Sequence, residues 1–463
     1  EHSQPPLVFL GKTMHVLLFL LLAYAHVALA TTQCNASAEY PACHAVPASS
    51  QRMRRELRTL SESQWSAVVD AMWIMKTVDM QEGQSRYGKA YRSYDYFTVM
   101  HGVISTDSRG DQSHYGAHFA TVHAAFCLEF ENALLAVDPT IEGLPYWDNA
   151  VLEPSVFTDE YFGVDPPRDG DRQVTTGRFA NWTINDSFNI SAWAEYIVDN
   201  STVTFRGNRA QQLRGNNNRL ATPSVTRIGS GAAWIALNLS QETWWRCAVG
   251  TEDQIWEDWL WCMDGPGPGH GLVHSVAHQS IGGQSGNFIG DFADIATSPN
   301  DPLFMFHHAN MVRSKMWWMI VHHAKRCSYY GFPLQDGAST WMENKEHMPW
   351  QPTLPLPPRT SYYGTNLNDV PGSTWGYTSE SLGLTHPLAP ADRQLTNADI
   401  ICWLLRYDSA PYTYDTQAAC LADDECHPKQ LTEPIDLVDS SVDSRIGIWL
   451  LVTAGCLMMQ SAA

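Results

Sequence analysis

The chain has 463 residues and a formal net charge of −20 at pH 7, because 49 Asp and Glu outnumber 29 Lys and Arg. A negative balance of this size disfavours nucleic acid and an anionic membrane face as binding partners. The length is enough for one large domain with a tail, or for two or three domains.

The N-terminal region has the pattern of a secretory signal at residues 14–30. An apolar run follows Met14 and ends in Ala28-Leu29-Ala30, so we expect cleavage after Ala30. Asn-x-Ser/Thr sequons, which suit a secreted glycoprotein, occur at Asn35, Asn181, Asn185, Asn189, Asn200 and Asn238. The predicted location is extracellular or at the cell surface.

The ten cysteines fit the same compartment, in which disulfide bonds form. Cys456 lies in an apolar C-terminal tail, and Cys127 falls inside a helical stripe, so we leave both out of the pairing. The closest spacings make Cys34/Cys43 and Cys420/Cys426 the first candidates for disulfides, with Cys247/Cys262 as a third. The sequence does not fix the connectivity.

Helical patterns dominate the first third of the expected domain. The chain is predicted to turn helical from Arg52, with Ser61 ahead of an apolar run. Residues 94–101 then place Tyr94, Phe97 and His101 on one helical face.

A third helix is predicted from about Phe119 to Ala136, and its apolar stripe contains His123. A histidine in such a stripe is most often an ordinary core residue, so His123 alone is weak evidence for a site. The loop before this helix carries two further candidates, His114 and His118.

Residues 150–260 are rich in Asn, Thr, Gly and Trp, and we expect irregular, glycosylated surface structure there. A Gly/Pro-rich loop follows at 264–271 and is expected to form part of the rim of a site. It contains His270. Asp264 is the nearest carboxylate upstream of Ser275, and it is expected on the far side of this loop.

The stretch from His274 to His308 has the pattern of a metal site. His274 and His278 are four residues apart, so a helix directs both to the same face until Gly282-Gly283 ends it. Asp301 and Pro302 suit the start of a second helix, which carries Phe304 and His308 one turn apart. Three imidazoles on two helices can hold a transition-metal ion with one position open. His270 and His274 have the same spacing, so the residues alone leave this register open.

The His274/His278 pair, followed by Gly-Gly and by DPLFMFHH, resembles the second copper segment of the tyrosinase family. The first copper segment of that family is similar to the stretch that runs from a loop histidine through FCLEFENALL to LPYWD. The resemblance covers roughly residues 52–325 and implies a mainly α fold, with a four-helix bundle around a dinuclear copper site, long irregular loops and a loop-rich C-terminal region. It assigns two copper ions to two sets of histidines: His101, His114 and His123, and His274, His278 and His308. The position of the glycines favours His278 over His270.

In function, the resemblance implies oxidation of o-diphenols to o-quinones with O2, sometimes after hydroxylation of monophenols. Phe304 would offer an aromatic surface to the phenol ring, with core packing as the alternative. Ser275 stands where phenol-hydroxylating relatives often have Asn, which favours diphenol oxidation. An O2- or metal-binding protein without oxidase turnover is the alternative function, and a zinc-loaded protein with a non-oxidative reaction is a third.

The sequence also departs from the family pattern. The usual Arg after the third histidine of the first site is Ala124, and the usual Asp four residues after the last histidine is Val312. Gln112 stands where some relatives have a cysteine that forms a thioether with a histidine. His307 is predicted not to bind the metal, because adjacent helical residues point about 100° apart.

The predicted division of the chain has four parts: a signal peptide (14–30), a dicopper domain (52–330), a loop-rich C-terminal region (331–441) and a hydrophobic anchor signal (442–463). The apolar run at 446–459 is shorter than the ~20 residues that a membrane-spanning helix needs. It resembles a GPI-attachment signal, with a tight single-pass anchor as the alternative. The physiological phenol, the oligomeric state and any activation step are not fixed by the sequence.

Overall fold

The structure of the chain is a computed structural model that describes residues 51–105, 113–114, 118–184, 223–236, 241–250, 256–264, 271, 273–285, 288–295, 298–321, 382–384, 400, 403–405 and 410–417. The predicted signal, the apolar tail and the Cys34/Cys43 and Cys420/Cys426 pairs lie outside these residues. So do His270 and every sequon except that of Asn181.

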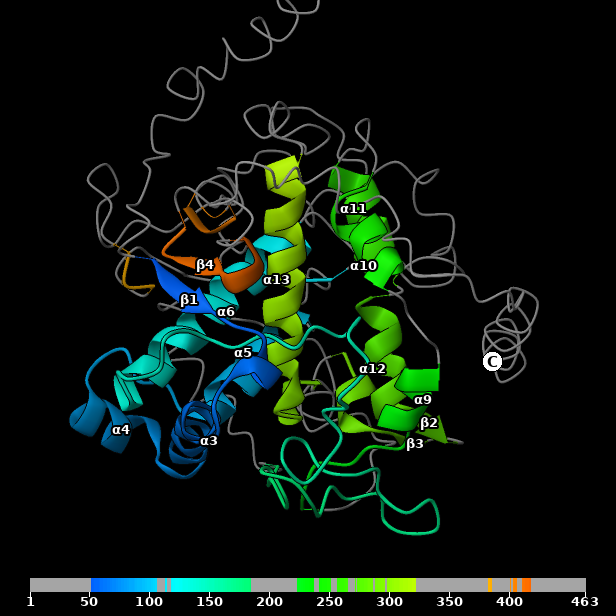
Figure 1. Cartoon of the computed structure of the whole chain (residues 1–463). Helices are drawn as coiled ribbons and strands as arrows, with labels where there is room; N and C mark the ends of the chain where they lie inside the picture. The colour runs from blue at the N-terminus through cyan, green and yellow to red at the C-terminus, as the bar shows by residue number, and fades with distance from the viewer. Residues whose placement is uncertain are drawn as a thin grey trace, which may run out of the picture.

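The described part of the chain is mostly helical, as predicted (Figure 1). Its α-helices are α3 (Glu62–Thr77), α4 (Met80–Tyr87), α5 (Tyr94–Ser105), α6 (His118–Val137), α9 (Gly231–Ala236), α10 (Gln241–Ala248), α11 (Trp256–Asp264), α12 (Ser275–Gly282) and α13 (Leu303–Val321). Short 3-10 helices occur at η2 (Leu57–Thr59), η3 (Asp291–Ala293) and η4 (Ser298–Asn300). The strands form two small sheets: β1 (Arg52–Arg54) runs parallel to β4 (Tyr412–Tyr414), and β2 (Gln284–Ser285) runs antiparallel to β3 (Phe288–Ile289).

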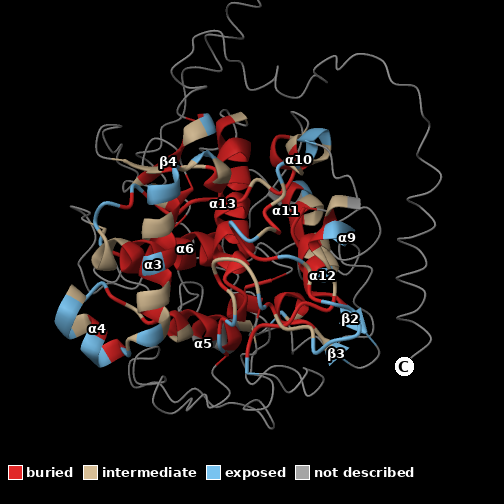
Figure 2. Cartoon of the chain, turned by 60° about the horizontal axis from the view of Figure 1, so that its bottom comes forward, coloured by how far each residue is buried: buried red, intermediate tan, exposed pale blue. Residues whose placement is uncertain are grey.

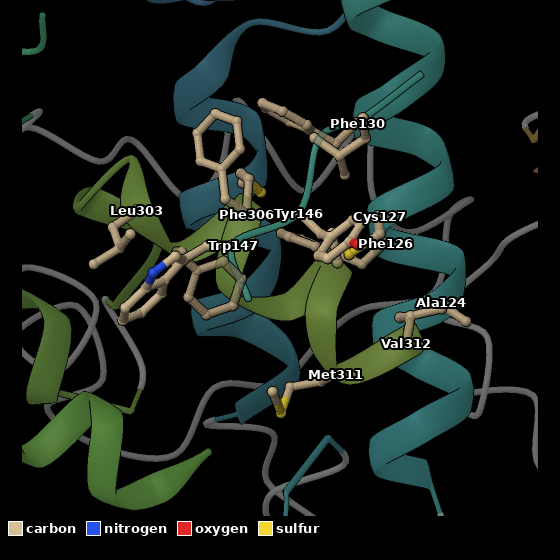
Figure 3. Packing of buried hydrophobic residues seen from close by; sticks show 14 of the residues in the cluster. Ala124, Phe126, Cys127, Phe130, Tyr146, Trp147, Leu303, Phe306, Met311 and Val312 are labelled. Atoms are coloured by element: carbon tan, nitrogen blue, oxygen red, sulfur yellow. The ribbon is translucent and has the colours of Figure 1, made fainter. Parts of the chain in front are cut away.

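Helix α13 is the centre of the core. Every residue from Leu303 to Ile320 is buried, and a helix that is covered on all sides belongs inside a protein. Figure 1 shows α5 and α6 on one side of α13 and α10, α11 and α12 on the other. Aromatic, aliphatic and sulfur-containing side chains fill the contact between α6 and α13 (Figure 3). Ala124 and Val312 are both buried in this cluster, so neither helix brings a charge to these two positions.

Helix α6 is the one described helix that is long and apolar enough to cross a membrane, over Phe119–Val137. Within the protein, 83% of its apolar window is buried against other elements, and Figure 2 shows it in the buried interior. Its apolar surface is therefore explained by packing in the core.

The helix expected from Arg52 begins later, at Glu62. Ser61 caps α3 by accepting from the backbone N–H of Gln64, whose side chain returns a bond to the Ser61 N–H, so the capping box fixes the start of the helix. Residues 52–54 instead form β1, which pairs with β4. This partner strand lies more than 350 residues later, so no local pattern indicates the pairing. The prediction of a helix at 52–54 is wrong for this reason.

Arg54 ties three distant segments together. Its Nε lies 2.6 Å from Glu131 Oε2 on α6, and its Nη1 donates to the Tyr414 hydroxyl at 3.0 Å. The guanidinium also lies 3.5 Å from the centre of the Tyr412 ring. Although burial opposes ionisation, Arg54 and Arg52 hold the pKa of Glu131 below its usual value. β1, α6 and β4 are therefore joined by one buried charge pair.

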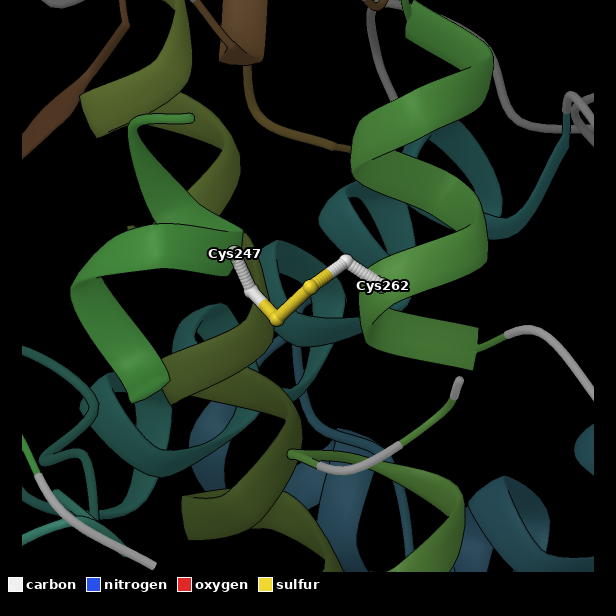
Figure 4. Close-up of a disulfide and its surroundings, with 2 residues drawn as sticks. All are labelled: Cys247 and Cys262. Carbon is white, nitrogen blue, oxygen red and sulfur yellow. A yellow bond between two sulfur atoms is a disulfide. The ribbon is translucent and has the colours of Figure 1, made fainter. Parts of the chain in front are cut away.

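Parts of the region expected to be irregular surface structure belong to the core. Phe162 and Phe179 stack with their ring centres 5.5 Å apart, and Trp182 is buried beside them. Helices α9, α10 and α11 belong to the same region, and the predicted Cys247–Cys262 disulfide joins α10 to α11 (Figure 4). Cys127 is a free, buried thiol, as expected.

We expect Glu131→Gln to lower the free energy of unfolding by about 3–5 kcal/mol, because it leaves the buried Arg54 guanidinium without its counter-charge. Urea denaturation measures this change. Glu82→Gln is the matched control, since Glu82 forms an exposed pair with Arg86 on α4 and should cost less than about 0.5 kcal/mol. Equal losses in the two variants would contradict the structural role of the Arg54 cluster.

Candidate metal centre

The first group of histidines comes from α5, α6 and the segment between them. His101 lies on α5, His123 on α6, and His114 in the described pair 113–114. Their ring centres are 5.0, 5.3 and 5.7 Å apart, and all three side chains are buried. One nitrogen from each ring lies within 4.8 Å of the others, a spacing that suits a single metal ion.

The second group comes from α12 and α13. His274 stands directly before α12, His278 lies one turn later, and His308 lies on α13. The Nε2 atoms of His274 and His278 are each 3.2 Å from Nε2 of His308. The rings of His123 and His308 stack 4.2 Å apart, so the two groups lie side by side. The structure thus brings together all six histidines that the sequence analysis assigned to copper.

Hydrogen bonds on the opposite ring nitrogen orient these imidazoles. Nδ1 of His123 donates to the carbonyl oxygen of Phe119 at 2.8 Å, and Nδ1 of His278 donates to that of Phe292 at 2.6 Å. Nδ1 of His274 lies 2.8 Å from Asp264 Oδ1. When Nδ1 carries the proton, the lone pair of Nε2 is available for a metal ion.

The donor set fits copper. Burial, followed by neighbouring histidines, lowers the pKa of His123 and His308 well below the usual value, and burial lowers the pKa of His278 to about 4. Burial therefore favours the neutral form of these three imidazoles, and neutral imidazole is a strong ligand for copper. Nε2 of His123 is also buried without a hydrogen-bond partner among the described residues, a costly state that a bound metal ion would relieve. The two groups suit a dinuclear copper site.

Glycines let the backbone close around α12. The predicted end of this helix is confirmed: α12 stops at Gly282, and Gly283 has φ +70°. A Cβ on Gly283 would lie 2.1 Å from the backbone nitrogen of Gly229, and one on Gly282 would lie 2.1 Å from that of Ala293. Side chains at these positions would push α12, and His278 with it, away from its neighbours.

A buried ion pair fixes the start of α13. Arg227 binds both carboxylate oxygens of Asp301, at 2.7 and 2.9 Å, while Asp301 Oδ1 accepts from the backbone N–H of Leu303. The predicted capping role of Asp301 is confirmed. The pair also sets the position from which Phe304 and His308 project.

Phe304 lies against both groups of histidines. Its ring centre is 4.0 Å from that of His308 and 4.9 Å from that of His101, and its side chain is fully buried. The small cavity beside the site is lined by His114, Asp264, His274, Ser275, His278, Gln279, Phe292, Ala293, Ile295 and Ser298. Phe304 is not among these residues. Its contact with a phenol ring therefore stays a prediction, while its packing against the histidines is directly visible.

His307 is a seventh buried histidine beside the centre. Its ring is parallel to that of His274 at 5.4 Å and lies 5.8 Å from Trp147. It belongs to neither group of three whose nitrogens converge. This placement agrees with the helical geometry that argued against His307 as a ligand.

Asp264 lies at the centre, and its expected position on the far side of the Gly/Pro loop is wrong. Its buried carboxylate contacts His274 Nδ1 at 2.8 Å and accepts from Ser275 Oγ at 3.3 Å. Sequence spacing gave no such signal, because Asp264 ends α11 and its contact with His274 depends on how α11 and α12 are placed in the fold. The Cys247/Cys262 spacing was the available hint, since a disulfide holds α11 in the core.

Comparison with known proteins gives a consistent result. Residues 91–320 match the common central domain of tyrosinase. Tyrosinase from Streptomyces antibioticus is 27% identical over 277 residues, which cover 57% of this chain and 84% of that protein. Grixazone synthase from Streptomyces griseus is 28% identical over 246 residues, or 50% of this chain and 76% of that protein. Among solved structures, polyphenol oxidase from Thermothelomyces thermophila has a TM-score of 0.48 and 20% identity, covering 79% of this chain and 89% of that one.

We expect Gly283→Ala to destabilise the protein and to reduce the copper content of the second group. Gly88→Ala is the matched control, because Gly88 has a similar backbone conformation but no atom within 4 Å of an added Cβ. The control should cost only the backbone strain of about 1–3 kcal/mol. Thermal unfolding and copper analysis measure both effects, and a control that loses as much copper would contradict this account of α12.

Proposed function

Because the chain belongs to the tyrosinase family, we propose that it oxidises o-diphenols to o-quinones with O2 at a pair of copper ions. The observation that carries this proposal is the meeting of two groups of three buried imidazoles, each with ring nitrogens close enough to share one metal ion. When bound, two copper ions together supply the two-electron chemistry that couples catechol oxidation to O2 reduction. We further propose His101, His114 and His123 as ligands of one ion, and His274, His278 and His308 as ligands of the other. In this proposal α5, α6, α12 and α13 act as the four-helix bundle around the pair.

The cavity supports the approach of a small phenol from the side of the second group. His114, His274 and His278 line this cavity, and Phe292 and Ile295 add apolar surface. Ile295 is 40% exposed, so this edge of the cavity meets solvent. A flat aromatic ring gains from contact with such a surface, while its hydroxyl groups can face the histidines.

A secreted location is part of the proposal. The Cys247–Cys262 disulfide is of a kind that persists in oxidising compartments. Asn181, in the described sequon, is exposed in a turn with φ +58°, where an attached glycan would meet no core residue.

We expect His308→Ala to lose one of the two copper ions and the near-ultraviolet absorption that O2 produces at a loaded dicopper centre. His308 contributes one of only three nitrogens in its group, so its loss leaves the ion with two. His307→Phe is the control: it keeps a ring beside His274 and should retain both ions. Loss of copper in His307→Phe alone would show that His307, and not His308, is the ligand. A wild-type protein that binds O2 without oxidising catechol would favour an oxygen-binding function.

We expect catechol oxidation to exceed hydroxylation of the matched monophenol. Phenol has a pKa of about 10 and needs a base to deprotonate at neutral pH, whereas a catechol is more acidic. The carboxylate nearest Ser275 is Asp264, which is already engaged by His274 and by Ser275 itself. Initial rates on the two substrates test this, and Ser275→Asn should raise the monophenol rate. Equal rates without a lag would show that another group serves as the base.

A further inference from the structure

Asp264 is the one carboxylate that contacts an imidazole in either group of three among the described residues. It is the last residue of α11, only 1% exposed, and its Oδ1 lies 2.8 Å from His274 Nδ1. The same oxygen accepts from Ser275 Oγ at 3.3 Å. This carboxylate therefore faces the metal centre from behind the ring of His274.

Three of the other imidazoles, those of His114, His123 and His278, rest on neutral groups. Backbone carbonyl oxygens hold Nδ1 of His123 and of His278. The Ser113 hydroxyl lies 3.0 Å from Nδ1 of His114. A negatively charged acceptor orients the ring and also makes its far nitrogen a stronger electron donor, which a neutral oxygen does to a smaller extent.

A covalent link carries Asp264 to this position. Cys262 lies two residues before Asp264 on α11 and forms the disulfide with Cys247 on α10. Helix α10 in turn packs on α13, where Trp245 meets Trp317 with ring centres 5.2 Å apart. The disulfide thus holds α11 to α10, and α10 packs on α13, the helix that carries His308. These contacts fix the position of the Asp264 carboxylate relative to the second group.

We propose that Asp264 is the positioning residue of the second copper site. It holds the proton on Nδ1 of His274, directs Nε2 to the metal ion and strengthens that bond. This inference rests on the proposed copper function. It differs from a role in accepting a proton from the substrate, because it predicts a change in metal binding before any substrate is present.

The test uses the full chain and measures copper binding by competition with a chelator of known affinity. We expect Asp264→Asn, which keeps the shape but removes the charge, to bind copper at the second site about 10–100-fold more weakly. Asp264→Glu restores the charge and should recover part of this loss. Asp415→Asn is the control, because Asp415 binds the Glu56 N–H and the Tyr146 hydroxyl and contacts no histidine.

Electron paramagnetic resonance identifies which ion is lost, since a lone Cu(II) gives a signal that a coupled pair does not. Half-loaded Asp264→Asn protein should give the spectrum of His278→Ala, in which the second site is disrupted, and not that of His101→Ala. Wild-type affinity in Asp264→Asn, or a spectrum like that of His101→Ala, would overturn the proposal. If Asp264→Asn does not fold, Asp264→Ser takes its place under the same criteria. Failure of the wild type to bind two copper ions would instead reject the proposed function.

Discussion

A buried imidazole can bind a metal ion through Nε2 while the ring is neutral, and a hydrogen bond on Nδ1 fixes the tautomer and the orientation of the ring. In this protein the Nδ1 partners come from separate elements: the carbonyl groups of Phe119 and Phe292 and the carboxylate of Asp264. Each partner needs its own segment in place, so the site depends on α6, on the turn around η3 and on the end of α11 together. The large aromatic core keeps water away from these bonds and so keeps the histidines neutral.

The segments that carry these partners are fixed by contacts that leave little freedom. Gly283 allows the backbone at Gly229 to pack against the end of α12. The Arg227–Asp301 pair links the same segment to the start of α13. The residues between 223 and 229 therefore act as a connector between the two helices of the second group. A buried ion pair of this kind is not a large net source of stability, but breaking it leaves an isolated buried charge. The pair therefore favours the arrangement in which residues 223–229 contact the start of α13.

The helices were predictable because they depend on local spacing, whereas the two groups of histidines were predicted from the resemblance to the tyrosinase family. Periodicity placed His101, His123 and His308 on helices, and Asp301 and Gly283 marked helix ends through ordinary capping chemistry. The strand at 52–54 was not predictable, because its partner lies at 412–414 and no local pattern reports such a pairing. The same limit explains Asp264, whose contact with His274 depends on how α11 is held in the core. Composition also misled for Phe162 and Trp182, which are buried within a stretch rich in polar residues.

The pairing of β1 with β4 has a consequence for the order in which the chain is made. Arg54 leaves the ribosome early, but its hydroxyl partner on Tyr414 is 360 residues later. At about 5–20 residues per second, the two are separated by tens of seconds of synthesis. Every histidine of the centre emerges within that interval. The nascent chain therefore holds both groups of histidines while the Arg54–Glu131 pair still lacks its contacts with Tyr412 and Tyr414 on β4.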